Sequence, residues 1–261
     1  MNTYDMIKIV LRHPLPILRY IRTGDIARVK EEYLRLMGVE WKKGQDYTDL
    51  VSKFHKLFYA SSEKIYENTH WMGVRVRKNA LDLWIYQEIL FEVKPDIIIE
   101  SGTAYGGSAL FLAHLCDILG KGHIISIDIR SKKNLPQHKR ITYMIGNSIS
   151  IEVAEAVEKI VSQIKDSGNS NLITMVILDS DHSKKHVLQE MNFYNKYVSV
   201  GSYLIVEDTN INGHPVFEEF GPGPYEAVEE FMRANPDFII DKSREKYFVS
   251  FNPNGFLKRI R

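Results

Sequence analysis

The sequence predicts an α/β fold, in which helices cover both faces of a mostly parallel, seven-stranded sheet closed by an antiparallel hairpin. Two observations predict it. From residue 95 onward, short apolar runs alternate with helix-forming segments, and this alternation is typical of a parallel sheet. The first apolar run ends in a glycine-rich turn that leads directly into a helix, which is the usual opening of a doubly wound domain.

The glycine-rich turn lies in the stretch PDIIIESGTAYGGSALFL, residues 95–112. The isoleucines at 97–99 predict a buried strand, and a helix is expected to begin near Gly106 and Gly107. Glycine lets the backbone approach a ligand closely, and the first turn of a helix offers free N–H groups to that ligand. The stretch therefore indicates a small-molecule site of the kind that holds a nucleotide-like cofactor.

The glycine order and one carboxylate narrow the choice of cofactor. Dinucleotide sites favour G-x-G-x-x-G, whereas here three residues separate Gly102 from Gly106, and Glu100 precedes the turn. A carboxylate beside the turn suits a cationic ligand and repels a pyrophosphate. S-adenosylmethionine (SAM) carries an ammonium and a sulfonium but no phosphate. The motif favours SAM, with a dinucleotide as the alternative.

The remaining elements follow from apolar periodicity and from residues that begin or end helices. Helices are expected at about 23–37, 47–66, 80–93, 107–119, 151–164, 184–197 and 225–233. Strands are expected at about 97–100, 123–130, 140–146, 172–179 and 202–208, with the closing hairpin at 238–241 and 247–251. Residues 70–79 are expected to be irregular. These elements divide the chain into a helical N-terminal extension, 1–69, and a cofactor-binding α/β domain, 70–261.

Composition argues against several classes of protein. Hydrophobic residues make up 44% of the chain, enough for a substantial core, and a net charge of +1 gives no reason to expect a nucleic-acid partner. The single cysteine, Cys116, cannot form an internal disulfide. The sequence shows neither an apolar run long enough to span a membrane nor a signal peptide. We therefore expect a cytoplasmic protein.

Residues 3–22 combine apolar and basic side chains, a composition typical of a helix that lies on a membrane surface. Pro14 and Pro16 interrupt such a helix. The interruption favours an arm that packs on the domain or on another subunit over contact with a membrane.

Polar side chains end several of the predicted strands, where open α/β sheets bind their ligands. Asp128, at the second strand, is placed to accept hydrogen bonds from ribose hydroxyls, unless it only caps a helix. Asn147 and Ser148, after the third strand, are expected to form the adenine-side edge. These residues would meet the glycine turn at one edge of the sheet.

Carboxylates also follow the fourth strand, at Asp179 and Asp181, and the fifth, at Glu207 and Asp208. Carboxylates at adjacent strand ends repel one another unless a cation neutralises them, and hard oxygen ligands suit Mg²⁺. The alternative is that one acid caps a helix while the others are solvated. The convergence of separate strands favours a metal site.

His182 lies three residues beyond Asp179, at the mouth of the expected site. Histidine has an unperturbed pKa near neutral pH, so His182 is a candidate general base. Lys184 and Lys185 are the fallback candidates, and the solvated surface of a helix is the expected place for both.

A loop rich in proline and glycine, residues 210–225, connects the fifth strand to its helix. This composition favours a defined loop shape over a flexible tether. We expect the loop to cover the acceptor, with His214 and Phe217 lining the pocket.

Several longer stretches are specific enough to suggest a family. They are DLWIYQEILFEVKPDIIIESGTAYGGSALFLA, ISIDI, ITYMIGNS, LDSDHS, GSYLIVEDTNINGHPVFEEFGPGPYEAVEEF and FNPNGFLKR. The chain resembles, over roughly Trp71 to Arg259, the cephalosporin hydroxylase and rhamnosyl O-methyltransferase family of class I SAM-dependent methyltransferases. The loop with NGHP and GPGP is the most specific match, and roughly the first fifty residues carry none.

The resemblance implies a Rossmann-like methyltransferase fold, bound SAM, a Mg²⁺ site and, commonly, an oligomer. It implies metal ligands at Asp179 or Asp181, and at Glu207 and Asp208. Asp179 is favoured because its spacing to Glu207 resembles that in related metal-dependent O-methyltransferases, whose base lies three residues on, here at His182. The expected cofactor contacts are Glu100, Gly102, Thr103, Tyr105, Gly107, Ser108, Asp128, Ile129, Asn147, Ser148 and Asp179.

We therefore expect a Mg²⁺-dependent SAM O-methyltransferase, a homo-oligomer that acts on a hydroxyl of a sugar, glycolipid or secondary metabolite. The metal would acidify the acceptor hydroxyl, the base would remove its proton, and SAM would deliver methyl in line. One alternative is a nicotinamide-dependent oxidoreductase, against which the glycine spacing argues. Another is a pathway partner that binds cofactor without turnover, against which the intact carboxylates argue. The sequence does not identify the acceptor.

Overall fold

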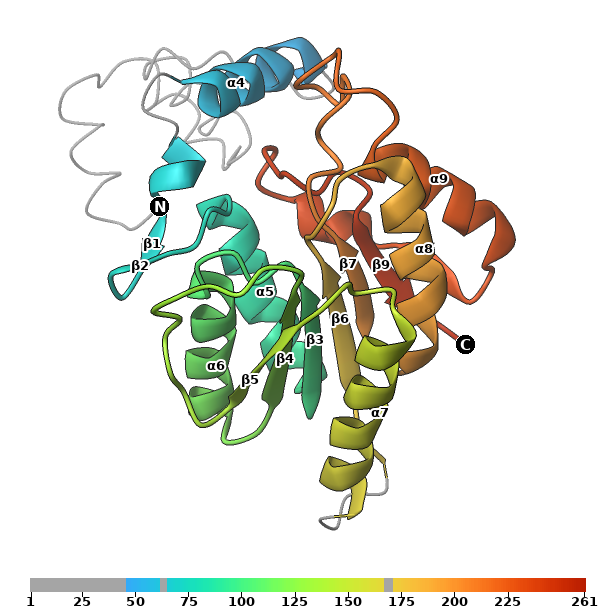
Figure 1. Ribbon diagram of the computed structural model, residues 1–261. Helices are drawn as coiled ribbons and strands as arrows, with labels where there is room; N and C mark the ends of the chain where they lie inside the picture. Colours follow the sequence, from blue (N-terminus) through green and yellow to red (C-terminus); the bar gives the residue numbers. More distant parts are fainter. Residues whose placement is uncertain (1–45, 62–64, 167–170) are drawn as a thin grey trace, which may run out of the picture. The chain divides into compact units, whose positions relative to one another are not determined.

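The computed structural model describes residues 46–61, 65–166 and 171–261 (Figure 1). The segments expected at 3–22 and 23–37 lie outside the described residues. None of the helices in the described ranges has the length and apolar character needed to cross a membrane.

Leu50 to Arg261 form one compact unit. Helix α4 (Thr48–Ala60) contributes to it, because the ring of His55 stacks on the ring of Phe251 with centroids 5.8 Å apart. The division of the chain by its contacts falls after Asp49, and the boundary expected after residue 69 stays a prediction.

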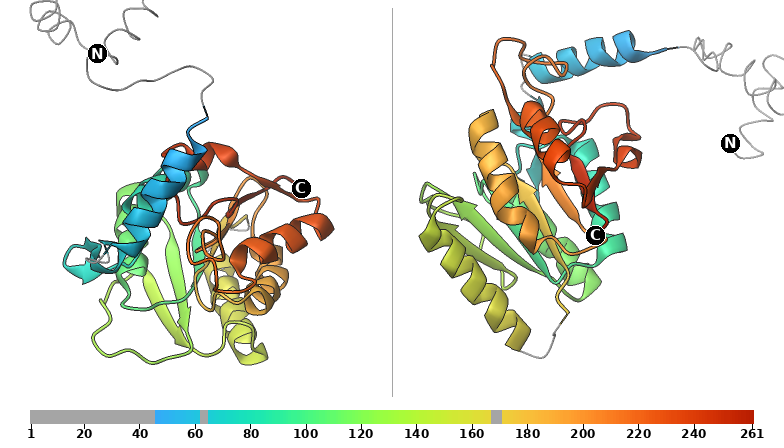
Figure 2. Two further views of the ribbon diagram at one scale, coloured as in Figure 1. Left: turned by 90° about the horizontal axis from the view of Figure 1, so that it is seen from above. Right: turned by 90° about the vertical axis from the view of Figure 1, so that its right-hand side faces the viewer.

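A seven-stranded sheet forms the centre of this unit, with helices on both faces (Figures 1 and 2). Its strands are β3 (Ile97–Ser101), β4 (His123–Asp128), β5 (Ile141–Ile145), β6 (Thr174–Leu178), β7 (Tyr203–Val206), β8 (Phe238–Ile240) and β9 (Phe256–Arg259). Their order is β5-β4-β3-β6-β7-β9-β8, and only the pairs that involve β9 are antiparallel. The chain runs outward from β3 to β5 and returns on the other side of β3 as β6, which creates the switch point where such sheets bind ligands.

Two helical layers cover the sheet. Helices α5 (Ala80–Val93) and α6 (Gly107–Leu119) pack on one face, and α7 (Ile151–Asp166), α8 (Lys184–Tyr194) and α9 (Pro224–Ala234) on the other (Figures 1 and 2). The side chains of Ile97 and Ile99 pack in the core between the sheet and α7, α8 and α9. That of Ile98 packs in the core between the sheet and α5 and α6. Because β3 is buried on both faces, its sequence is a continuous apolar run rather than an alternating one. The predicted α/β fold with a mostly parallel sheet and antiparallel strands at one edge is confirmed.

The expected hairpin strand at 247–251 is wrong. Phe248 has a φ of 67°, in the left-handed region, which interrupts an extended strand there. Phe251 instead packs edge-on against the rings of Tyr59 and Tyr66. The antiparallel partner is β9, whose Phe256 and Leu257 are fully buried between β7 and β8.

Residues 70–79, expected to be irregular, contain a short antiparallel hairpin of β1 (His70–Trp71) and β2 (Val74–Arg75). Trp71 anchors it on α6, because its ring packs edge-on against Phe111 with centroids 5.0 Å apart. A Cβ on Gly107 would lie 2.2 Å from the Arg75 carbonyl oxygen, so only glycine fits at this helix start. The hairpin therefore packs against the start of α6, next to the glycine-rich turn.

Candidate active site

A cavity of about 640 Å³ lies at the carboxyl ends of the five parallel strands. The residues that follow β3, β4, β5, β6 and β7 line it, together with Tyr59 of α4 and residues of the loop before α9. The expected site residues that line the cavity are Gly102, Thr103, Ser108, Asp128, Ile129, Asn147, Ser148, Asp179, His182 and Asp208. Glu100, Tyr105, Gly107 and Glu207 are not among the lining residues.

Asp128 stabilises the turn between β3 and α6 from the neighbouring strand. Its Oδ2 accepts a hydrogen bond from Ala104 N at 3.0 Å, and its Oδ1 accepts one from Arg130 N at 2.8 Å. A carboxylate oxygen can accept more than one hydrogen bond, so the side chain can still bind a ligand while it holds both loops.

Glu100 lies beneath the cavity, fully buried in β3. Burial raises the pKa of its carboxyl to about 7. Its Oε2 accepts a hydrogen bond from Ser126 Oγ at 2.7 Å. Its Oε1 is buried without a hydrogen-bond partner in the described residues, as is Oγ of Ser108, which lines the cavity. Tyr105 does not line the cavity, and the guanidinium of Arg75 lies 5.1 Å from its ring centroid.

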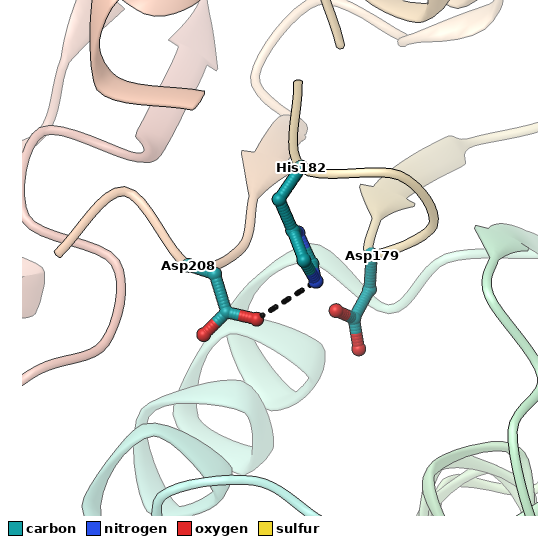
Figure 3. Close-up of side chains that lie close together, drawn as sticks. All are labelled: Asp179, His182 and Asp208. Carbon is teal, nitrogen blue, oxygen red and sulfur yellow. Dashed lines mark ion pairs between the residues drawn. The ribbon is translucent and has the colours of Figure 1, made fainter. Parts of the chain in front are cut away.

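Asp179, His182 and Asp208 form one cluster after β6 and β7 (Figure 3). Each offers a ligand atom, and these atoms all lie within 4.8 Å of one another. His182 Nε2 is 3.2 Å from Asp208 Oδ2. Burial raises the pKa of both carboxyls, against the opposing effects of Lys78 and His182. Asp208 has a φ of 54°, a strained backbone conformation of the kind found at functional sites.

Glu207 lies outside this cluster, in the interior. Its Oε1 is 2.6 Å from the ammonium of Lys78 and accepts a hydrogen bond from the Tyr86 hydroxyl. The same ammonium is 2.5 Å from Oδ2 of Asp179. The structure therefore adds Lys78 to the site. Its position directly before the Asn79 cap of α5 gave no signal of this role in the sequence.

Asp181 and Lys184 have contacts of their own. Asp181 Oδ1 accepts a hydrogen bond from Ser183 N at 2.8 Å, where α8 begins, and the residue lies outside the cluster. Lys184 pairs with Glu230 of α9 at 2.8 Å. Of the two aspartates after β6, only Asp179 therefore approaches Asp208.

Aromatic side chains also line the cavity. They are Tyr59 and Tyr66, together with Phe217 and Phe220 from the loop before α9. His214, expected in the pocket, instead stacks on Tyr225 with ring centroids 3.7 Å apart and pairs with Glu226 at 2.9 Å. The Glu226 carboxylate also accepts hydrogen bonds from Gly223 N and Asn212 Nδ2, and so fixes both ends of the loop.

Comparisons with known proteins agree with this architecture. A protein-family model described as rhamnosyl O-methyltransferase/CmcI matches residues 63–260. A rhamnosyl O-methyltransferase of Mycobacterium leprae is 38% identical over 238 residues, which cover 90% of this chain and 100% of that protein. One of Mycobacterium tuberculosis is 38% identical over 216 residues, with coverages of 80% and 85%. A solved structure described as CmcI with Mg and SAM is 21% identical, covers 75% of this chain and 78% of its own, and has a TM-score of 0.55, which shows a shared fold.

Proposed function

The chain belongs to the rhamnosyl O-methyltransferase/CmcI family of SAM-dependent O-methyltransferases, and we propose that it methylates a hydroxyl of a sugar with the help of Mg²⁺. One observation carries the proposal. A single cavity brings the glycine-rich turn after β3 together with the cluster of Asp179, His182 and Asp208. A cofactor bound at the turn would therefore lie next to groups that can activate a hydroxyl.

The residues around the turn fit SAM. Glu100 Oε1 is buried without a hydrogen-bond partner in the described part of the chain apart from the nearby Ser108 hydroxyl, which lowers the pKa of the carboxyl, and a cationic ammonium is the kind of group that such a carboxylate would bind. Asp128 lines the cavity at the end of β4, where a ribose would bind, and Asn147 and Ser148 follow at the end of β5. The buried carboxylate of Glu100 also argues against a pyrophosphate, and so against a nicotinamide cofactor.

The cluster fits a hard divalent cation. Asp179 and Asp208 present carboxylate oxygens to one point, and Mg²⁺ prefers such ligands. We propose Asp179 and Asp208 as ligands, with Glu207 as the third carboxylate, although Lys78 holds its Oε1. Bound Mg²⁺ would lower the pKa of an acceptor hydroxyl.

His182 is the proposed general base. Its Nε2 faces Asp208, whose carboxylate at 3.2 Å would stabilise the imidazolium that forms when the ring takes the acceptor proton. Lys184 is engaged with Glu230. The aromatic rings that line the same cavity, Tyr59 and Phe217 among them, offer flat apolar faces against which a sugar ring can pack.

The test is a turnover assay with the full chain, SAM, Mg²⁺ and a panel of sugar acceptors that includes rhamnosyl compounds. Mass spectrometry should detect one added methyl group on an acceptor and an equal amount of demethylated cofactor. If no acceptor is methylated and titration instead shows fluorescence of bound NADH, the oxidoreductase alternative is favoured.

A further inference from the structure

The ammonium of Lys78 lies between carboxylates that follow two neighbouring strands. Nζ is 2.5 Å from Asp179 Oδ2 and 2.6 Å from Glu207 Oε1, and the side chain is 3% exposed. Asp179 also belongs to the cluster that lines the cavity. The Asp179 carboxylate thus contacts a fixed cation on one side and faces the proposed metal site on the other.

The surroundings of Lys78 are acidic. Although burial disfavours its charge, the attraction of Asp179, Glu207 and Glu100 holds the pKa of Lys78 above its usual value. Such a buried ammonium is tolerated only with close counter-charges, and buried carboxylates need a cation for the same reason. Lys78 and the carboxylates therefore depend on each other.

We propose that Lys78 is the built-in counter-cation of the metal site, which neutralises Asp179 and Glu207 when no metal is bound and competes with the metal for the same carboxylates when one binds. The inference rests on the proposed Mg²⁺ site. Two cations that share carboxylates repel each other. Lys78 is thus a positioning residue that stabilises the metal-free site and weakens the affinity for the ion.

A purely structural lysine would behave differently. Its loss would disorder the two carboxylates, so metal binding would weaken or stay unchanged. Loss of a competing cation instead leaves the carboxylates free for the ion, so metal binding becomes tighter. The direction of the change in metal affinity separates the two roles.

The experiment is a Mn²⁺ titration of the full chain followed by electron paramagnetic resonance, for wild type, Lys78→Met and Lys78→Arg. Methionine keeps an unbranched side chain without the charge, and arginine keeps the charge. We expect Lys78→Met to lower the Mn²⁺ dissociation constant by about tenfold or more, equivalent to about 1.4 kcal/mol. Lys78→Arg should bind Mn²⁺ no more tightly than wild type. Without metal, Lys78→Met should melt at a lower temperature than wild type. Saturating Mn²⁺ should raise the melting temperature of Lys78→Met by more than it raises that of wild type.

A second pair of variants covers the case in which Lys78→Met alone does not fold. Lys78→Met combined with Glu207→Gln removes one positive and one negative charge together, which is far less disruptive than breaking a buried pair. This double variant should bind Mn²⁺ more tightly than Glu207→Gln alone. If wild type binds no Mn²⁺, both the metal site and the inference fail. If wild type binds Mn²⁺ but removal of Lys78 tightens binding in neither background, the inference alone is overturned.

Discussion

Gly102 lies directly against the carbonyl group of Asp179: a Cβ on Gly102 would be 1.8 Å from that oxygen. The φ of Gly102 is +92°, in a region that only glycine adopts readily. Asp179 N in turn donates a hydrogen bond to the Ser101 carbonyl at 2.9 Å. The cofactor turn after β3 and the first carboxylate after β6 are therefore packed backbone against backbone, which joins the two halves of the proposed active site.

Gly102→Ala should destabilise the protein by about 3 kcal/mol or more, since it adds a steric overlap to an unfavourable backbone conformation. Gly221→Ala is the matched control. Gly221 also has a φ of +92°, but a Cβ there would meet nothing within 4 Å. Denaturant unfolding should therefore show a clearly smaller loss for Gly221→Ala. Equal losses would mean that the contact with Asp179 contributes nothing beyond backbone strain.

His182→Ala should slow methyl transfer by about a hundredfold to ten-thousandfold, the usual contribution of a positioned base. SAM affinity should stay near that of wild type. Lys184→Ala is the control, because Lys184 pairs with Glu230 and should leave the rate unchanged. Single-turnover transfer measured against pH decides the matter. If Lys184→Ala is inactive while His182→Ala keeps the rate and pH dependence of wild type, Lys184 is the general base and His182 is not.

Asp179→Asn should raise the Mg²⁺ concentration needed for half-maximal activity by at least about tenfold, a loss seen even for outer-sphere partners. Excess Mg²⁺ should restore part of the rate. Asp181→Asn tests the neighbouring carboxylate, whose hydrogen bond from Ser183 N an amide oxygen can also accept. It should leave the Mg²⁺ dependence unchanged. The assignment of Asp179 as a ligand is wrong if the two variants exchange these results.

His55 should make the fold sensitive to mild acid. Its side chain is 3% exposed, its Nε2 is 3.0 Å from Asn210 Nδ2, and burial lowers its pKa to about 4. The unfolded chain binds a proton near the ordinary histidine pKa of about 6.5, whereas the folded chain does not. Stability from this residue is therefore complete above pH ~6.5 and is lost as the pH falls toward 4, by up to about 3 kcal/mol.

The measurement is the melting temperature between pH 7.5 and 5 for wild type, His55→Gln and His70→Gln. His55→Gln should be less stable at neutral pH but should lose less on acidification than wild type. His70 is exposed, and its replacement should leave the pH dependence of the melting temperature as in wild type. If the melting temperature of His55→Gln falls with pH as steeply as that of wild type, the acid sensitivity does not come from His55.

Much of the fold could be predicted because the signals are local. The isoleucines at 97–99 predict a buried strand, and the turn at Gly102, a few residues later, predicts its ligand-binding end. Asp128 could be placed for the same reason, since it directly ends β4. The closing hairpin could not, because 247–251 and Phe256–Arg259 are both apolar enough for a strand. Backbone conformation and pairing with β7 selected the second.

The carboxylates show what the sequence by itself determined and what only the tertiary structure decided. The sequence determined that acidic residues follow β6 and β7, and that His182 lies near them. Only the structure decided that Asp208 meets the cavity while Glu207 turns to Lys78. The backbone of Asp208 leaves the extended conformation of β7, with a φ of 54°, and its side chain reaches the cavity while that of the adjacent Glu207 is buried. Which of them faces inward depends on the register of β7 in the sheet and on Lys78, which the segment before α5 places next to Glu207.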